Sequence, residues 1–350
     1  MISDFLIVGA GVAGLTTAQQ LLMQGNIVTI LDRGAAGMES SWAGGGILSA
    51  LCPWDYPDEV TRLTSMGAAL YPRWADALYA TTGIDSEYEI SGMQVLPPFD
   101  FSAARNWGIK NQYELEKNGD VVLLPEVAQV RNPRLIQALR KHVGMLGGRI
   151  VEHCNVQQIA IEERRVSAVI TSGGTFNAGQ YIISAGAWST QLLGTHALQL
   201  DIKPVRGQML LYKFAAPPLP HIVLQDGMYL IPRRDGHVLV GSTLENVGFD
   251  KSTTAEARVS LQRRAQLILP ALREMPVVQH WSGLRPASPG NIPTIGQHPY
   301  LQNLYLNSGH FRYGVTMAPA SSALLINELN GSVQPFDVSP YHASWGVVAV

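Results

Sequence analysis

The feature that most constrains this chain is a glycine-rich turn close to its N-terminus. Residues 5–8 (FLIV) form an uninterrupted apolar run, as expected of a strand that is buried on both faces of a parallel sheet. The segment 9–14 (GAGVAG) follows at once, and apolar residues then recur at helical spacing up to Gly25. A second apolar run, 27–31, ends at Asp32. Strand, turn, helix, second strand and acid therefore arrive in the order of a dinucleotide-binding unit.

Each part of this unit has a physical task in holding a dinucleotide. Gly9 permits the tight turn, Gly11 lets a pyrophosphate approach the backbone, and Gly14 lets the helix pack closely on the strand. The helix N-terminus supplies amide donors and a partial positive charge to the phosphates. Asp32 stands where its carboxylate can accept hydrogen bonds from ribose hydroxyls. The pattern predicts a bound dinucleotide, but it does not separate FAD from NAD.

The composition excludes several classes of protein. A chain of 350 residues has room for about two domains. With 46% apolar and 15% charged residues, it is not intrinsically disordered. The net charge of −2 gives no broad positive surface, so we expect neither a nucleic-acid partner nor binding to an anionic membrane. The sequence contains no run of about 18 apolar residues, so we expect no membrane insertion.

Cysteines and histidines narrow the class further. Cys52 and Cys154 are the only cysteines, which excludes a disulfide scaffold and a cysteine-rich metal site. The nine histidines show no metal-ligand spacing, so we expect no metal. No basic stretch precedes the first apolar run, and the chain is therefore expected to be a soluble cytoplasmic protein.

The middle of the chain continues the α/β pattern. Asn132, followed by a proline, is expected to cap a helix that ends at the glycine pair 147–148. Small residues at 185–189 (AGAWS) follow the last strand of this region and would let a cofactor lie close. The strands expected here lie at 150–156, 166–171 and 180–184.

Residues 204–281 follow a different pattern. Short apolar runs alternate with turn residues, and 233–236 (RRDG) joins two of them as a hairpin. This predicts an inserted antiparallel sheet, followed by a helix over 255–268. Further on, the glycine-flanked segment 309–315 leads into a helix over 316–329. The N-terminus of that helix would stabilise negative charge on an electron-rich ring.

Together with the N-terminal unit, several later motifs resemble the FAD-dependent D-amino acid oxidase family, and most closely its bacterial glycine oxidase branch. They occur in the family's order and span residues 2–329. The motifs are 40–48 (SSWAGGGIL), 204–207 (PVRG), 229–233 (YLIPR), 241–243 (GST), 281–286 (WSGLRP) and 309–314 (GHFRYG).

The resemblance implies an α/β flavoprotein with a Rossmann-like, doubly wound FAD domain and an inserted, mostly antiparallel substrate domain. It also implies a homo-oligomer, either a dimer or a tetramer. The FAD domain would comprise 1–85, 130–203 and 282–335, the substrate and oligomerisation domain 86–129 and 204–281, and the tail 336–350. The implied cofactor-binding residues are Gly9, Gly11, Val12, Ala13, Gly14, Asp32, Arg33, Ser40, Ser41, Ala43, Gly44, Gly45, Gly46, Ile47, Leu48, Val156, Ala185, Gly186, Trp188, Arg285, His310, Phe311, Arg312, Tyr313, Gly314, Val315 and Thr316.

The resemblance also implies a chemistry. Arg285 would hold an amino acid carboxylate by two parallel hydrogen bonds, with Tyr229 and Arg312 beside it and Ile47 and Leu244 as apolar lining. The α C–H would then lie about 3–3.5 Å from the flavin N5. A hydride would pass to N5 from the neutral amine of glycine, sarcosine or a small D-amino acid, without a general base. The products would be an imine or oxo acid, ammonia or an amine, and hydrogen peroxide. In this branch the glycine imine is used in the synthesis of the thiazole ring of thiamine.

Two departures and several alternatives stay open. Leu224 and Gly227 precede Tyr229, at positions where glycine oxidases carry bulkier groups. The smaller or less polar residues of this chain would widen the pocket. Both cysteines lie early in the chain, so non-covalent FAD is expected. The alternatives are a dehydrogenase of the same fold that passes electrons to a quinone or carrier, a flavoprotein module without turnover, and a nicotinamide dehydrogenase.

Overall fold

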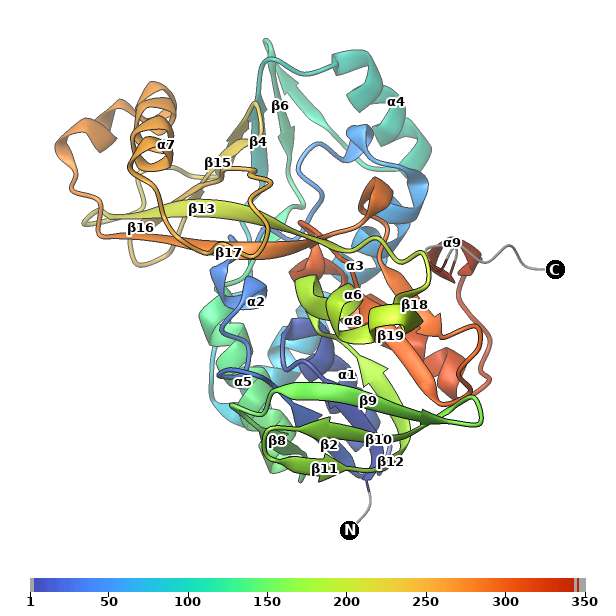
Figure 1. The fold of residues 1–350 in the computed structure, drawn as a ribbon. Helices are drawn as coiled ribbons and strands as arrows, with labels where there is room; N and C mark the ends of the chain where they lie inside the picture. The colour runs from blue at the N-terminus through green and yellow to red at the C-terminus, as the bar shows by residue number, and fades with distance from the viewer. Residues whose placement is uncertain (1–2, 343–344, 346–350) are drawn as a thin grey trace.

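The computed structural model describes residues 3–342 and residue 345, and it arranges them around two large sheets (Figure 1). One sheet has six strands in the order β18-β19-β12-β1-β2-β8. Neighbouring strands run parallel, except that β18 is antiparallel to β19. The strands are β1 (Ser3–Val8), β2 (Val28–Leu31), β8 (Arg149–Val151), β12 (Ala178–Ile183), β18 (Thr294–Gln297) and β19 (Leu304–Ser308).

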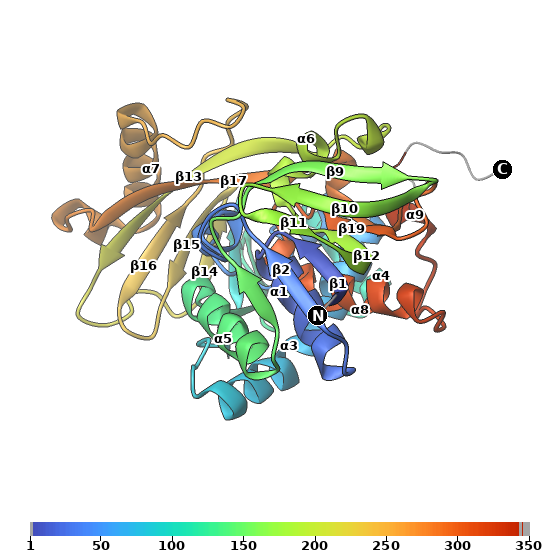
Figure 2. The ribbon, with the colours of Figure 1, turned by 60° about the horizontal axis from the view of Figure 1, so that its bottom comes forward.

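The two faces of this sheet are covered differently, as Figure 2 shows. Helices α1, α5 and α8 pack on one face, and the small antiparallel sheet β9–β11 covers the other. Val166 and Val169 of β10 share a core with Leu6 and Val8 of β1. Because β1 is covered on both faces, its residues 5–8 are apolar without alternation. These elements are α1 (Val12–Met23), α5 (Asn132–Met145), α8 (Gly314–Leu329), β9 (Val156–Glu162), β10 (Arg165–Thr171) and β11 (Gly174–Phe176).

The second large sheet has eight strands in the order β17-β13-β16-β15-β14-β4-β6-β5. Neighbouring strands within this sheet run antiparallel, except for the parallel pair β14 and β4. The predicted hairpin turn at 233–236 joins β15 to β16. The strands are β4 (Met93–Leu96), β5 (Glu116–Asn118), β6 (Val121–Leu124), β13 (Lys203–Lys213), β14 (Ile222–Gln225), β15 (Met228–Pro232), β16 (His237–Gly241) and β17 (Gln279–Ala287).

The predicted fold class is confirmed by these two sheets and the helices between them. β17 continues in the eight-stranded sheet through Ala287, which is past the expected domain boundary at residue 282. The division into domains stays a prediction. The remaining elements are α2 (Ser40–Ala43), α3 (Asp58–Thr82), α4 (Phe101–Asn111), α6 (Ser189–Leu193), α7 (Ala255–Ile268), α9 (Ser339–His342), β3 (Glu89–Ile90), β7 (Ala128–Gln129) and the 3-10 helices η1 (Pro53–Asp55), η2 (Gly186–Trp188), η3 (Gly194–Ala197), η4 (Pro270–Glu274) and η5 (Pro289–Asn291).

Two local predictions are corrected by the structure. Asn132 does not cap α5: Arg131 holds the cap position, and the Asn132 side chain donates to the Ser41 carbonyl at 2.8 Å. The strand expected over 150–156 divides into β8 and β9. His153 has φ +54°, which breaks the extended backbone, and the amides of His153 and Cys154 donate to the carbonyls of Gly34 and Asp32.

The C-terminal end has more structure than its sequence indicated. No element was expected over 338–350, but α9 forms there and Trp345 is buried against His298 at 4.8 Å between ring centroids. Residues 343–344 and 346–350 of the expected tail lie outside the described residues. No helix within the described ranges combines the length and the apolar character that a bilayer span requires.

Candidate active site

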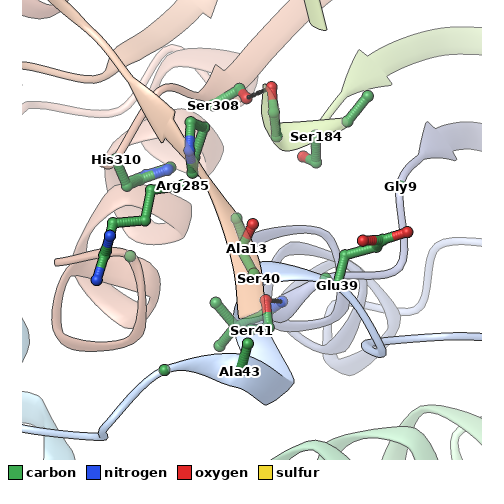
Figure 3. A pocket seen from close by; sticks show the side chains of 18 of the residues that line it. Gly9, Ala13, Glu39, Ser40, Ser41, Ala43, Ser184, Arg285, Ser308 and His310 are labelled. Atoms are coloured by element: carbon green, nitrogen blue, oxygen red, sulfur yellow. Dashed lines mark hydrogen bonds between the residues drawn. The ribbon is translucent and has the colours of Figure 1, made fainter. Parts of the chain in front are cut away.

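A cavity of about 500 Å³ opens where the carboxyl ends of β1, β2, β12 and β19 meet the N-termini of α1 and α8. Strands of the eight-stranded sheet close it on the other side. Ligands of parallel α/β sheets bind at this place in the fold. Figure 3 shows its two ends, which we call the glycine end, around Gly9 and Glu39, and the arginine end, around Arg285 and His310.

The turn at the glycine end has a backbone that requires glycine. Gly9 has φ +107°, and a Cβ there would overlap a carbonyl at the end of β12. A Cβ at Gly14 would overlap the carbonyl oxygen of Gly9. Helix α1 starts after Gly11 without a side-chain cap, although the Val12 amide donates to Ser41 Oγ at 2.9 Å. An uncapped helix start beside a glycine turn is suited to an anion such as a pyrophosphate.

Asp32 lies directly after β2, where the sequence places it. Its Oδ2 accepts from the Ala10 amide at 2.8 Å, and its Oδ1 accepts from the Gly34 amide at 2.9 Å. Burial raises the pKa of the Asp32 carboxyl, and these two hydrogen bonds oppose that shift. Each carboxylate oxygen keeps lone-pair capacity for a ligand hydroxyl.

A flat cationic and aromatic wall stands beside Asp32. The Arg33 guanidinium lies 3.5 Å from the centre of the Trp188 ring, and Arg33 pairs with Glu39 at 2.9 Å. Val156 also lines this part of the cavity. Such a wall is suited to a flat ring system at the glycine end.

A buried arginine holds the loop 44–46 against the protein. Arg233 donates to the Gly45 carbonyl at 2.6 Å, to Gln129 Oε1 at 2.6 Å and to the Val130 carbonyl at 2.9 Å. The residue is 3% exposed, and burial lowers its pKa to about 10. Because all three acceptors are neutral, this guanidinium serves to fix a backbone rather than to form an ion pair.

Replacing Arg233 by methionine is expected to lower the free energy of unfolding by about 2 kcal/mol, because buried acceptors lose their donor. Urea denaturation of the purified protein measures this change. The control is Arg234→Met, since Arg234 forms exposed pairs with Glu89 and Asp85. That change should stay within about 0.5 kcal/mol. Equal losses in both variants would contradict the anchoring role of Arg233.

The arginine end is built around Arg285. Its Nη2 donates to Ser242 Oγ at 2.5 Å, and its Nη1 donates to the Thr243 carbonyl at 3.2 Å. Burial lowers the pKa of Arg285, Tyr229 opposes that shift, and Arg312 adds to it. Tyr229 and Arg312 line the same cavity as Arg285. A guanidinium has five N–H donors, so some remain for a ligand carboxylate.

His310 lines the cavity beside Arg285 (Figure 3) and is buried. Its Nε2 lies 3.1 Å from Ser321 Oγ, and burial lowers its pKa to about 4. The imidazole is therefore neutral in the folded protein near pH 7.

This histidine predicts a loss of stability in acid. The unfolded chain takes up a proton on His310 near pH 6.5, whereas the folded chain does so only near pH 4. Stability from this group is therefore complete above pH 6.5 and falls as the pH drops toward 4, by about 2 kcal/mol between pH 7 and pH 5. Urea unfolding at both pH values should show a smaller pH difference in His310→Gln than in the parent protein. An identical pH difference in the two proteins would contradict this account.

Most of the residues predicted from the sequence reach the cavity wall. Gly14, Leu48 and Thr316 lie behind it, where Thr316 Oγ1 donates to the Ile47 carbonyl at 3.1 Å and so holds the loop. The predicted residues on the wall are Gly9, Gly11, Val12, Ala13, Asp32, Arg33, Ser40, Ser41, Ala43, Gly44, Gly45, Gly46, Ile47, Val156, Ala185, Gly186, Trp188, Tyr229, Arg285, His310, Phe311, Arg312, Tyr313, Gly314 and Val315.

The predicted apolar lining at Leu244 is corrected by the structure. Leu244 is 54% exposed and stands outside the cavity wall. The chain turns the Thr243 carbonyl toward Arg285, which leaves the next side chain facing outward. The wider pocket expected from Leu224 and Gly227 also finds no support: Leu224 pairs with Tyr229 inside the sheet, and neither residue lines the cavity.

Several residues of the cavity wall were not predicted from the sequence. Three of them, Asn132, Ser184 and Asn307, each carry a buried oxygen without a hydrogen-bond partner in the described part of the chain. Lone polar residues at strand ends and helix starts were the only available signal. The wall residues not predicted are Val8, Leu31, Glu39, Ser49, Leu51, Asn132, Cys154, Asn155, Gln157, Ser184, Gln191, Leu192, Gly207, Met209, Ser242, Gly283, Pro286, Asn307 and Ser308.

Comparison with known proteins agrees with this site. The family model of FAD dependent oxidoreductases (DAO) matches residues 4–328. The chain belongs to this family. The predicted resemblance and the FAD dependence of this DAO chain are thereby confirmed.

Relatives of this DAO chain cover nearly its whole length. It is 42% identical to a glycine oxidase of Pseudomonas putida over 97% of this chain and 98% of that protein. It is 33% identical to the bifunctional protein ThiO/ThiG of Synechocystis over 92% of this chain and 51% of that protein. The solved structure of glycine oxidase from Geobacillus kaustophilus has a TM-score of 0.92 at 26% identity, and the match covers 97% of each chain.

The residues of this DAO chain fit FAD. The glycine turn and the uncapped start of α1 leave backbone amides for a pyrophosphate, and Asp32 is placed for a ribose. The unpaired oxygens of Asn132, Ser184 and Asn307 lie on the same wall and would be satisfied by polar groups of the cofactor. Loop 44–46 carries only hydrogen atoms as side chains, so a flat ring can lie against its backbone.

Proposed function

We propose that this chain oxidises the amine of glycine, sarcosine or a small D-amino acid with FAD and dioxygen. The observation that carries the proposal is the half-buried Arg285 on the wall of the FAD cavity, which Tyr229 and Arg312 also line. A guanidinium binds a carboxylate by two parallel, charge-assisted hydrogen bonds. The similarity to glycine oxidases of two Pseudomonas species supports the same class of substrate.

The proposed site binds and orients the substrate with its own side chains. Arg285 holds the carboxylate, the Tyr229 hydroxyl adds a donor, and Arg312 adds a second positive charge. Leu51 and Met209 are buried on the same wall and exclude water from the α-carbon. Holding the carboxylate in one orientation brings the α C–H to a fixed place in the cavity.

Bound FAD supplies the hydride acceptor and passes the electrons to dioxygen, which yields hydrogen peroxide. At the glycine end, the proposed holding residues are those of the turn 9–14 together with Asp32 and Arg33. The loop 44–46 would carry the flavin, and Arg233 keeps that loop in place. FAD is proposed to bind without a covalent bond.

An anaerobic absorbance titration of the purified, FAD-loaded protein tests the proposal. Glycine, sarcosine, D-alanine, D-proline and a larger D-amino acid are added in turn, and air is then admitted. Bleaching followed by recolouring with peroxide is the expected result, and the ranking names the preferred substrate. Bleaching that air reverses only slowly would favour a dehydrogenase with another acceptor. No bleaching by any of them would overturn the proposal.

The proposal extends to the role and setting of the enzyme. The similarity to ThiO/ThiG supports a supply of glycine imine for the thiazole of thiamine. The free thiols Cys52 and Cys154 support a cytoplasmic location, because reducing compartments preserve thiols. Val259 and Leu267, exposed on α7 of the proposed oligomerisation domain, support a homo-oligomer. Light scattering of the purified enzyme tests the last point, and a monomer would overturn it.

A further inference from the structure

The segment 242–254 connects β16 to α7 and contacts both ends of the cavity. Its first residues, Ser242 and Thr243, accept the two hydrogen bonds from Arg285. Further along, Phe249 stacks on Trp188 at 5.4 Å, and Lys251 pairs with Glu39 at 3.0 Å. The position of the Arg285 guanidinium therefore depends on where this segment lies.

A buried arginine in β13 fixes the segment. Arg206 is 4% exposed. Its Nη2 and Nε donate to Glu245 Oε2 at 2.5 and 3.0 Å, and its Nη1 donates to Asp250 Oδ2 at 2.5 Å and to Ser252 Oγ at 3.2 Å. The backbones of Arg206 and Glu245 also pair, at 2.9 and 3.0 Å. One guanidinium thus joins three residues of the segment to the eight-stranded sheet.

A chain of hydrogen bonds runs from this arginine to the one in the cavity. Glu245 Oε1 accepts from Thr243 Oγ1 and, at 2.9 Å, from Gln208 Nε2. The backbone N–H of Gln208 donates to Thr243 Oγ1 at 2.8 Å. The carbonyl of the same Thr243 accepts from Arg285. Arg206, Glu245, Thr243 and Arg285 therefore form a connected series in which each member holds the next.

The sheet leaves space for Arg285 beside this series. Gly207 follows Arg206 in β13, and a Cβ there would overlap the Arg285 guanidinium. Arg206 itself does not line the cavity. Burying a guanidinium is costly even when it is paired. At Arg206 the buried guanidinium supports a series of hydrogen bonds that ends at Arg285.

We propose that Arg206, acting through Glu245 and Thr243, is a positioning residue that sets where Arg285 presents its N–H groups to a carboxylate. This inference rests on the proposed function in one respect, namely that Arg285 binds the carboxylate of the substrate.

The experiment compares binding of acetate and of uncharged acetamide to the FAD-loaded protein, measured by the change in flavin absorbance. In Arg206→Met, the Kd of acetate and the KM of glycine should rise together by about tenfold to a hundredfold, because a small displacement of a binding group has effects of this size. Acetamide binding and FAD content should stay unchanged. Arg206→Lys keeps one charged donor. Its Kd for acetate should lie between those of the parent protein and of Arg206→Met. Arg234→Met, which removes exposed ion pairs at the turn between β15 and β16, is the control.

A second variant keeps the test decisive if Arg206→Met does not fold. Glu245→Gln retains a hydrogen-bonding side chain of the same size. It should also raise the Kd of acetate, but by a smaller factor than Arg206→Met. In an Arg285→Ala background, a change at Arg206 should add no further loss, because the two residues act in one series. Parent-like acetate binding in both Arg206→Met and Glu245→Gln would overturn the proposal, as would a parent protein that does not bind acetate. If acetate binding responds as expected but glycine, sarcosine and the D-amino acids do not bleach the flavin, the proposed function fails and the positioning role stands.

Discussion

Replacing Arg285 by alanine is expected to leave FAD bound and to remove about 2–5 kcal/mol of substrate binding, the usual loss when one partner of a buried charge pair is truncated. The carboxylate of the substrate would then enter a buried site without its cation, and the nearby Arg312 does not present the same pair of donors. Steady-state kinetics with glycine or sarcosine measure the loss as a fall in kcat/KM. Absorbance of the flavin shows at the same time whether the cofactor is retained.

The control for this variant is Arg285→Lys. Lysine keeps the positive charge but loses the planar fork that holds a carboxylate by two bonds, so it should restore only part of the binding. A general loss of structure would instead lower FAD content and unfolding stability in both variants. Unchanged kcat/KM in Arg285→Ala would remove this residue from substrate binding.

The glycine end could be predicted from the sequence because its parts are neighbours in the chain. The turn 9–14 is followed by its own helix, and Asp32 ends the next strand, so local geometry determines where each residue lies. The wall residue Ser184 directly follows β12, and Asn307 lies in β19. β12 pairs with β1 and β19 pairs with β12 only when the sheet forms. No local pattern distinguishes such residues from ordinary polar residues at strand ends.

The arginine end required more than the sequence could supply. Arg285 was identified through a family motif, and Ser242 and Thr243 belong to another motif, but their hydrogen bonds to Arg285 were not predicted. The resemblance implied Leu244 as apolar lining, yet the Thr243 carbonyl accepts from Arg285 and the Leu244 side chain is exposed. The direction of a side chain after a turn depends on tertiary hydrogen bonds, in this case those that begin at Arg206. The motifs therefore contained the residue that binds and several residues of its network, but not the hydrogen bonds that join them.

Replacing Gly14 by alanine is expected to weaken FAD binding by about a hundredfold, because the added Cβ would overlap the Gly9 carbonyl. The overlap is with backbone, so it can be relieved only by moving helix α1 or the turn that faces the pyrophosphate. Overpacking of this kind costs about 1–3 kcal/mol, and the rigid neighbour favours the upper end. The Kd of FAD is measured by equilibrium titration of the deflavinated protein with FAD, with fluorescence quenching as the signal.

Gly144→Ala is the matched control for this substitution. Gly144 also lies inside a helix, α5, but a Cβ there would contact nothing within 4 Å. Alanine should therefore leave FAD binding unchanged and raise the free energy of unfolding by up to about 1 kcal/mol, since it is the better helix former. If Gly14→Ala bound FAD as tightly as Gly144→Ala, close packing of α1 against the turn would not be what the glycine provides. A loss of FAD binding confined to Gly14→Ala would show that the absence of a Cβ at Gly14 lets the N-terminus of α1 lie at the distance the pyrophosphate requires.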